Sequence, residues 1–197
     1  MLPYLLTHGI LGNSPIRVRL SDPGTPDVLK LQGSAGLLTS SGMPKPAYYA
    51  CMMLAKMQGD LLNWSANHAV IRTGSTYFAL VFNYDDETQQ LCTEQATLRE
   101  TDTIVNQFHQ QLDINITLSH LSGKYTITKY IHTGQDSVFD MLSKLDFPDS
   151  FSPSADLGLE SYTAPRMDLF TETVSSDLTV NFSLEELGAV IAVIEPV

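Results

Sequence analysis

The sequence predicts a mainly β protein, an antiparallel β-sandwich with a few short helices. Two observations carry this prediction: apolar and polar residues alternate in several segments after residue 60, and short turn signals separate those segments. Such a strand hides one face in the core and exposes the other, which is the pattern of sandwich sheets. The 197 residues, 43% of them apolar, suffice for one core with an appendage.

The first sixty residues are expected to form a separate region. Residues 13–28 are rich in proline and glycine, which break regular elements. A helix is then predicted from about Ala47 to Gly59, because Pro46 is tolerated in a first helical turn and glycine favours a helix end. Its apolar residues recur at helical spacing: Tyr49, Met52, Met53, Leu54 and Met57.

A β-hairpin is predicted next, from residues 69–72 and 77–83. Residues 85–90 are polar and are expected to form a loop. Residues 94–109 are also mostly polar, and a short helix there would turn three apolar residues toward the core: Ile104, Val105 and Phe108.

Strictly alternating segments follow at residues 112–118 and 125–131, with a turn signal at Ser122-Gly123 between them. Each is predicted to be a strand with one buried face.

The last third of the chain mixes both element types. Residues 136–145 are expected to be helical, and a short turn or helix is expected from Ser152-Pro153 to just before Pro165. Residues 178–184 alternate again, and the continuously apolar residues 189–194 indicate a buried strand.

Charge and composition exclude several classes of function. The chain has 22 acidic and 11 basic residues, a formal net charge of −11, which repels phosphate backbones and argues against direct nucleic-acid binding. No run approaches the roughly 20 apolar residues needed to cross a bilayer, and residues 1–11 lack the basic start of a signal peptide. Two distant cysteines, Cys51 and Cys92, fit neither a disulfide framework nor a zinc site, so a cytoplasmic protein without cofactor or metal is expected.

Two acidic clusters are candidate cation sites. Asp85-Asp86-Glu87 and Glu185-Glu186 lack the spaced ligands of a calcium loop, so both are interpreted as solvated turns.

One block of the sequence resembles a known family. Gly36-Leu37-Leu38-Thr39, followed by Gly42 and by Lys45-Pro46-Ala47-Tyr48-Tyr49-Ala50, is similar to glycoside hydrolase family 39, whose best-known members are β-xylosidases. Weaker matches follow in the same order, among them Asn83-Tyr84 and Gly123-Lys124-Tyr125, and the resemblance covers about residues 21–197.

The resemblance implies a domain division. The first block would close the eighth unit of a (β/α)8 barrel, so residues 1–60 would be a barrel remnant consisting of the last strand, loop and helix. Residues 61–197 would be the β-sandwich domain. The main partner would be the missing barrel of a longer protein, because one strand cannot close a barrel.

The resemblance also implies that this chain carries no catalytic residues. Retaining glycosidases use two carboxyl groups about 5–5.5 Å apart. In this family one lies in an Asn-Glu-Pro motif and the other in a Glu-Trp context. Here the sole Glu-Pro, Glu195-Pro196, follows Ile194, and the sole Trp64 follows Asn63.

Two positions of the family's substrate site depart from its pattern. Asp22 follows Ser21 but precedes Pro23-Gly24, and Gln32 stands where the family usually has His. Asp22 and Gln32 are the candidate substrate-binding residues, for a xylose-type sugar. The departures favour the sugar-responsive or structural region of an arabinose-regulator (AraC) type transcription regulator; the alternative is the accessory domain of a β-xylosidase. A third possibility is that the sandwich itself binds carbohydrate through Tyr125 and Tyr130.

Overall fold

The computed structural model describes residues 19–21, 36–38, 42, 44–93, 98–135, 138–146 and 164–197. These residues fall into two compact units. The first takes its described residues from Met1–Cys51, Asp85–Gln107 and Gly134–Ala164, and the second comprises Met52–Tyr84, Phe108–Thr133 and Pro165–Val197. The domain boundary expected near residue 60 stays a prediction.

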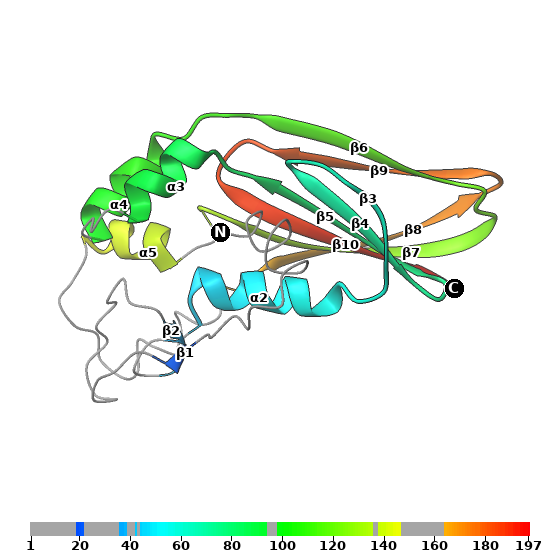
Figure 1. Cartoon of the computed structure of the whole chain (residues 1–197), viewed down its shortest axis with the longest axis horizontal. Helices are drawn as coiled ribbons and strands as arrows, with labels where there is room; N and C mark the ends of the chain where they lie inside the picture. The colour runs from blue at the N-terminus through cyan, green and yellow to red at the C-terminus, as the bar shows by residue number, and fades with distance from the viewer. Residues whose placement is uncertain are drawn as a thin grey trace. The chain divides into compact units, whose positions relative to one another are not determined.

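The second unit contains a six-stranded antiparallel sheet with the strand order β3-β4-β5-β10-β7-β8 (Figure 1). Its strands are β3 (Asp60–Trp64), β4 (His68–Thr73), β5 (Thr76–Asn83), β7 (Gly123–Thr133), β8 (Arg166–Val174) and β10 (Gly188–Pro196). The hairpin expected from residues 69–83 is confirmed as β4 and β5.

A second sheet faces the first. It consists of β6 (Leu112–Ser119) and β9 (Asp177–Leu184), which pair antiparallel from Leu112↔Leu184 to Ser119↔Asp177. One core forms between the sheets, where Val81, Ile127 and Ile194 share a cluster with Leu178 and Phe182. The predicted fold class, a mainly β antiparallel sandwich with a few short helices, is confirmed.

The turn expected at Ser122-Gly123 is present, and it carries the chain from one sheet to the other. Gly123 has a φ of 111°, a backbone conformation open chiefly to glycine. Among the described strands, β6 pairs with β9 alone, whereas β7 pairs with β10 and β8. The chain crosses between the sheets again from β8 to β9. The backbone N–H of Leu121, before β7, donates to the carbonyl of Ser176, before β9, at 2.6 Å, so a hydrogen bond joins the two crossings.

The first unit begins with β1 (Arg19–Ser21) and β2 (Gly36–Leu38), which pair in parallel. Helix α2 (Pro46–Lys56) follows, close to the predicted range, and Lys45 donates its backbone N–H to Leu37 at 2.9 Å just before it. A parallel strand followed by a helix is the arrangement of the expected β/α remnant. From Met52 onward α2 belongs to the second unit.

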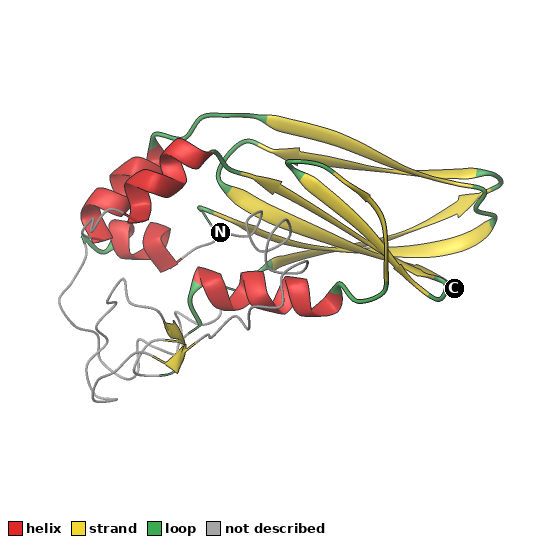
Figure 2. Cartoon of the chain, viewed as in Figure 1, coloured by secondary structure: helices red, strands yellow, loops and turns green. Residues whose placement is uncertain are grey.

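Three further helices gather in the first unit (Figure 2). They are α3 (Asp86–Thr93), α4 (Leu98–Asn106) and α5 (Val138–Lys144). The helices expected within residues 94–109 and 136–145 are thereby confirmed. The turn or helix expected from Ser152-Pro153 lies outside the described residues.

The loop prediction for residues 85–90 is wrong, because this segment begins a helix. The backbone N–H of Thr88 donates to Asp85 Oδ1 at 2.6 Å, so Asp85 caps α3. Asp86 and Glu87 lie in its first turn, where the helix dipole favours negative charge. The acidic cluster is therefore explained as a helix start rather than a solvated turn.

Candidate functional site

The two predicted substrate-binding residues, Asp22 and Gln32, lie outside the described residues. Their role stays a prediction.

The two tyrosines considered for carbohydrate binding lie on opposite faces of the six-stranded sheet. Tyr125 is only 8% exposed and belongs to the core cluster, so its proposed role as an exposed stacking platform is wrong. Tyr130 is five residues further along β7, so its side chain points to the other face, and it is half-buried there. We call this second face the outer face.

Strand register aligns the outer-face side chains in two adjacent rows across all six strands. The first row is Leu61, Ile71, Phe78, Val193, Thr128 and Leu169. The second row is Trp64, Ala69, Leu80, Ile191, Tyr130 and Met167. We call these twelve residues the outer band, in which Thr128 alone lacks an apolar or aromatic side chain.

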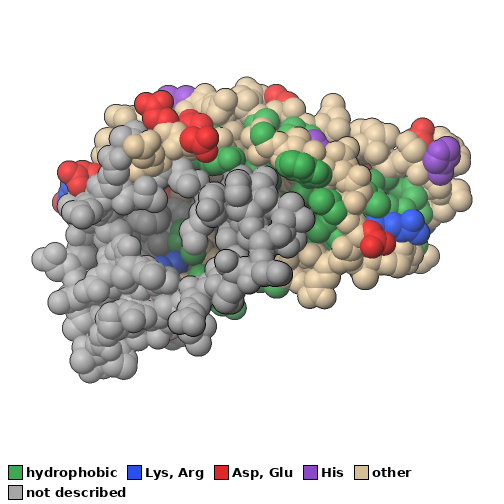
Figure 3. Space-filling model, viewed as in Figure 1, with side chains coloured by type: hydrophobic (Ala, Val, Ile, Leu, Met, Phe, Trp, Pro, Cys, Tyr) green, Lys and Arg blue, Asp and Glu red, His purple; other side chains and the backbone are tan. Residues whose placement is uncertain are grey.

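The outer band is buried in the middle and exposed at both ends. Leu80 and Ile191 are fully buried. At the two edge strands, Leu61 and Trp64 are 55% and 59% exposed, and Met167 and Leu169 are 58% and 62% exposed. Figure 3 shows that apolar side chains also reach the molecular surface in several places between polar ones.

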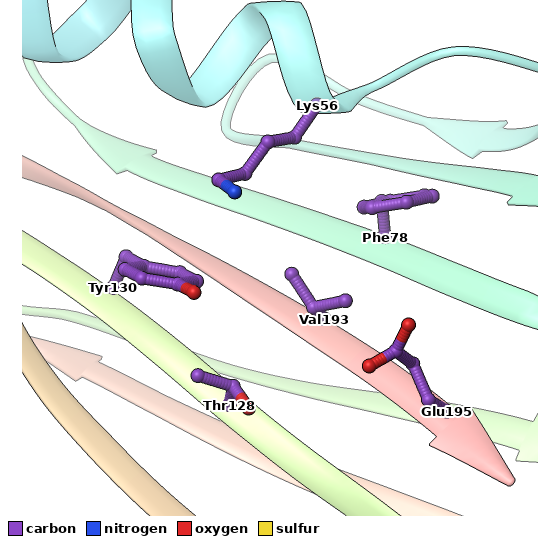
Figure 4. Close-up of a pocket in the computed structure, with 6 residues that line it drawn as sticks. All are labelled: Lys56, Phe78, Thr128, Tyr130, Val193 and Glu195. Carbon is purple, nitrogen blue, oxygen red and sulfur yellow. The ribbon is translucent and has the colours of Figure 1, made fainter.

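A pocket of about 330 Å³ opens within the outer band. Phe78, Val193, Thr128 and Tyr130 line it from β5, β10 and β7, and Lys56 and Glu195 complete the lining (Figure 4). Phe78 and Val193 are register partners, and so are Val193 and Thr128, so the floor is part of one row of the outer band.

The two charged side chains of the pocket are Lys56 and Glu195. The Lys56 ammonium lies 5.0 Å from the centre of the Tyr130 ring, a cation–π contact, and Glu195 supplies the carboxylate. The lining combines Phe78 and Val193 with the polar groups of Lys56, Thr128, Tyr130 and Glu195, so the pocket is more polar than apolar. The single carboxylate does not provide the pair that glycoside hydrolysis uses.

Sequence reasoning pointed to Tyr130 but missed the rest of this pocket. A signal was present in β5 and β10, because Phe78-Ala79-Leu80-Val81-Phe82 and Ala189–Ile194 are apolar without alternation. A continuously apolar strand is covered on both faces. The pairing that unites these strands into one band is visible only in the fold.

On the inner face, Lys129 is the notable charge. Its ammonium donates to the carbonyl of Asn181 at 2.7 Å and lies 5.2 Å from the centre of the Phe182 ring. Burial lowers the pKa of Lys129, and the nearby carboxylates of Asp168 and Glu172 oppose that shift. These contacts link the two sheets, so the role of Lys129 is structural.

Asn83, part of the family-like Asn-Tyr pair, is also structural. It is buried, and its side-chain amide donates to the carbonyls of Gln110, Leu184 and Glu186 at 2.5, 3.3 and 3.1 Å. The end of β5 is thus tied to the segment before β6 and to the turn after β9.

The described residues contain no group of three or more His, Cys, Asp or Glu side chains that could hold a metal ion. Cys51 forms no disulfide, and burial raises the pKa of its thiol. Among the described helices, none is long and apolar enough to span a bilayer.

Comparisons with known proteins show the fold. No protein-family model matches, and no curated protein is similar enough to count as a relative. A glycoside hydrolase family 39 enzyme from Xanthomonas axonopodis pv. citri matches 90% of this chain with a TM-score of 0.70 at 20% identity, over 36% of its own length. A monomeric β-xylosidase from Caulobacter crescentus matches 84% of this chain with a TM-score of 0.65 at 17% identity.

A further structure of a family 39 β-xylosidase from Caulobacter crescentus matches 90% of the chain with a TM-score of 0.62 at 17% identity. The chain spans 34% of the length of both Caulobacter structures. The described fold is therefore that of about one third of these larger proteins.

Proposed function

We propose that this chain is the non-catalytic C-terminal β-sandwich region of a protein similar to family 39 glycosidases, with residues 1–60 as the end of a (β/α)8 barrel. The observation that carries the proposal is the likeness in fold over 90% of the chain to an enzyme of which the chain spans 36%. The pocket with its single carboxylate, Glu195, agrees with a supporting role.

The activity of the whole protein would reside in the barrel. In the first candidate function, the whole protein hydrolyses β-xylosides in the cytoplasm, and this chain supports the barrel. Two of the three solved structures above are β-xylosidases, which favours this candidate.

A second candidate is the sugar-responsive or structural region of an AraC-type regulator. The sequence departures at Asp22-Pro23 and Gln32 favour it, because a substrate site altered at those positions is suited to binding a sugar without hydrolysing it.

The first test is an assay of the purified chain with 4-nitrophenyl β-D-xyloside. We expect a cooperatively unfolding protein with no turnover, because the hydrolytic carboxylates belong to the barrel. Turnover that copurifies with the chain through successive columns would overturn the proposal.

The second test separates the two candidates by the polypeptide encoded directly upstream. Asn-Glu-Pro and Glu-Trp motifs, with xyloside hydrolysis by the longer protein, support the xylosidase. Helix-turn-helix motifs with sugar-dependent DNA binding support the regulator. A longer protein with neither set of properties contradicts both.

A further inference from the structure

We propose that the free edge of β8 pairs with the same edge of a second copy of this chain, so that two six-stranded sheets join into one across a two-fold axis. β8 lies at one end of the six-stranded sheet (Figure 1), and among the described strands it pairs with β7 alone. This homodimer goes beyond the proposed function and does not depend on it.

The backbone groups of β8 point alternately toward β7 and away from it, as in any antiparallel pair. The N–H of Leu121 donates to the carbonyl of Ser176, and these two residues continue the register in which Gly123 lies opposite Val174. The even-numbered residues of β8 therefore direct their N–H and C=O groups to β7, and the odd-numbered residues direct theirs outward. The outward row is Met167, Leu169, Thr171 and Thr173.

β8 lacks the backbone features that discourage pairing at a sheet edge. Its nine residues pair with β7 in an unbroken register, and none of them is proline. β3, at the other edge of the same sheet, has five residues and a register shift between Leu61 and Asn63. On β9, the Lys129 ammonium occupies the carbonyl of Asn181 at 2.7 Å. Of these three strands, β8 is the best suited to accept another strand.

The charges of β8 complement a second copy of β8 in one antiparallel register. When Leu169 lies opposite Leu169 of the second copy, Arg166 lies opposite Glu172 of that copy. A two-fold axis makes this ion pair occur twice, and opposite charges on directly opposed residues stabilise a strand pair. An axis at Phe170 would instead place Asp168 opposite Glu172, and these like charges repel.

The side chains around this axis are accessible to a second copy. Met167 and Leu169 are 58% and 62% exposed on one face of the sheet, and Phe170 is 36% exposed on the other. The Arg166 side chain is 62% exposed, although its guanidinium lies 3.9 Å from the carboxylate of Asp168. Edge pairing would bury apolar area on both faces in addition to forming the main-chain hydrogen bonds that give strand addition its affinity.

Sedimentation velocity of the chain tests for the dimer at concentrations from about 5 to about 500 µM. A salt concentration of about 0.15 M screens the repulsion between two chains that each carry a net charge of −11. Contact along one strand is small, so we expect a reversible dimer with a dissociation constant of about 10–100 µM. A monomer at every concentration would overturn the proposal.

A proline variant tests whether the outward backbone groups make the contact. Leu169→Pro removes an N–H that points away from β7, so the pairing with β7 should survive, as urea unfolding will verify. Dimerisation should weaken roughly tenfold or more, because one main-chain hydrogen bond is lost from each copy. Leu169→Val keeps the N–H and an apolar side chain, and it should dimerise like the wild type. Equal dimerisation of the two variants would exclude this edge.

Charge reversal tests the register. Arg166→Glu brings like charges together on both sides of the axis and should weaken dimerisation roughly tenfold. Adding Glu172→Arg restores opposite charges in exchanged positions and should return the affinity to within roughly threefold of the wild type. Lys124→Glu makes the same change in net charge at an exposed residue of β7 and should have little effect. If the second substitution does not rescue the first, the proposed pairing is wrong, and the proposed function is unaffected.

Discussion

The two faces of the six-stranded sheet differ in how they are completed. The inner face is closed by β6 and β9, and large side chains such as Ile127, Leu178 and Ile194 are fully buried between the sheets. The outer face carries an apolar band of similar breadth, but its ends on β3 and β8 remain exposed. The inner face therefore supplies stability to the described chain, whereas the side chains at the ends of the outer face are exposed and contribute little to it.

The strongest test of this contrast makes the same substitution on each side. Leu178→Ala on β9 should lower the free energy of unfolding by about 2–5 kcal/mol, because the fully buried side chain leaves a cavity. Leu169→Ala on β8, which is largely exposed, should change it by less than about 0.5 kcal/mol. Urea unfolding of both variants measures the difference, and equal losses would abolish the contrast.

Asn83 tests whether polar contacts also concentrate on the inner side. Asn83→Ala should cost about 1–3 kcal/mol, because the carbonyls of Gln110, Leu184 and Glu186 lose a shared donor. Asn181→Ala, which removes an exposed amide from β9, is the control and should be nearly neutral. A neutral result for Asn83→Ala in thermal and urea unfolding would show that these three hydrogen bonds do not stabilise the protein.

A variant of Lys56 tests how much its cation–π contact with Tyr130 contributes to the free energy of unfolding. Lys56→Ala removes the cation over the Tyr130 ring and should lower the free energy of unfolding by about 0.5–1 kcal/mol. In a double-mutant cycle with Tyr130→Leu the effect should shrink, because the ring that the ammonium contacts is gone. Additive losses would mean that the contact does not stabilise the protein.

The smallest expected effect is a pH dependence at Lys129. Because burial lowers its pKa below the ordinary 10.5, the folded state releases this proton at lower pH than the unfolded state. Its contribution to the free energy of unfolding therefore rises as the pH increases from the lowered pKa toward 10.5. Relative to Lys129→Met, the wild type should gain on the order of a few tenths of a kcal/mol in that window, since partial exposure screens the charge. A constant difference would contradict this assignment.

The same contrast explains which strands the sequence could predict. In β6 and β9 apolar and polar residues alternate, because one face of each strand is buried and the other is exposed to solvent. The burial of their residues follows the same period of two. β3 and β8 were not predicted, and nearly every residue in these edge strands is exposed, so their burial shows no alternation. An edge strand is defined by the strand with which it pairs, and its own sequence does not identify that strand.

The candidate site was predictable only in part, for a related reason. Tyr130 was identified as an aromatic candidate, but so was Tyr125, and one position of register decides between core and surface. The outer band joins six strands that lie between residues 60 and 196, so only the pairing order reveals it. Helix α3 was missed because its side chains are mostly polar, and Asp85 makes sense as a cap only once the helix is seen.

The position of β10 has a consequence for synthesis. This strand occupies residues 188–196, yet it lies between β5 and β7 and holds the two halves of the large sheet together. A ribosome therefore releases β3–β5 and then β7–β8 before the strand that unites them emerges. Folding of the sheet must wait for residue 196, and until then the apolar edges of β5 and β7 need shielding from other nascent chains.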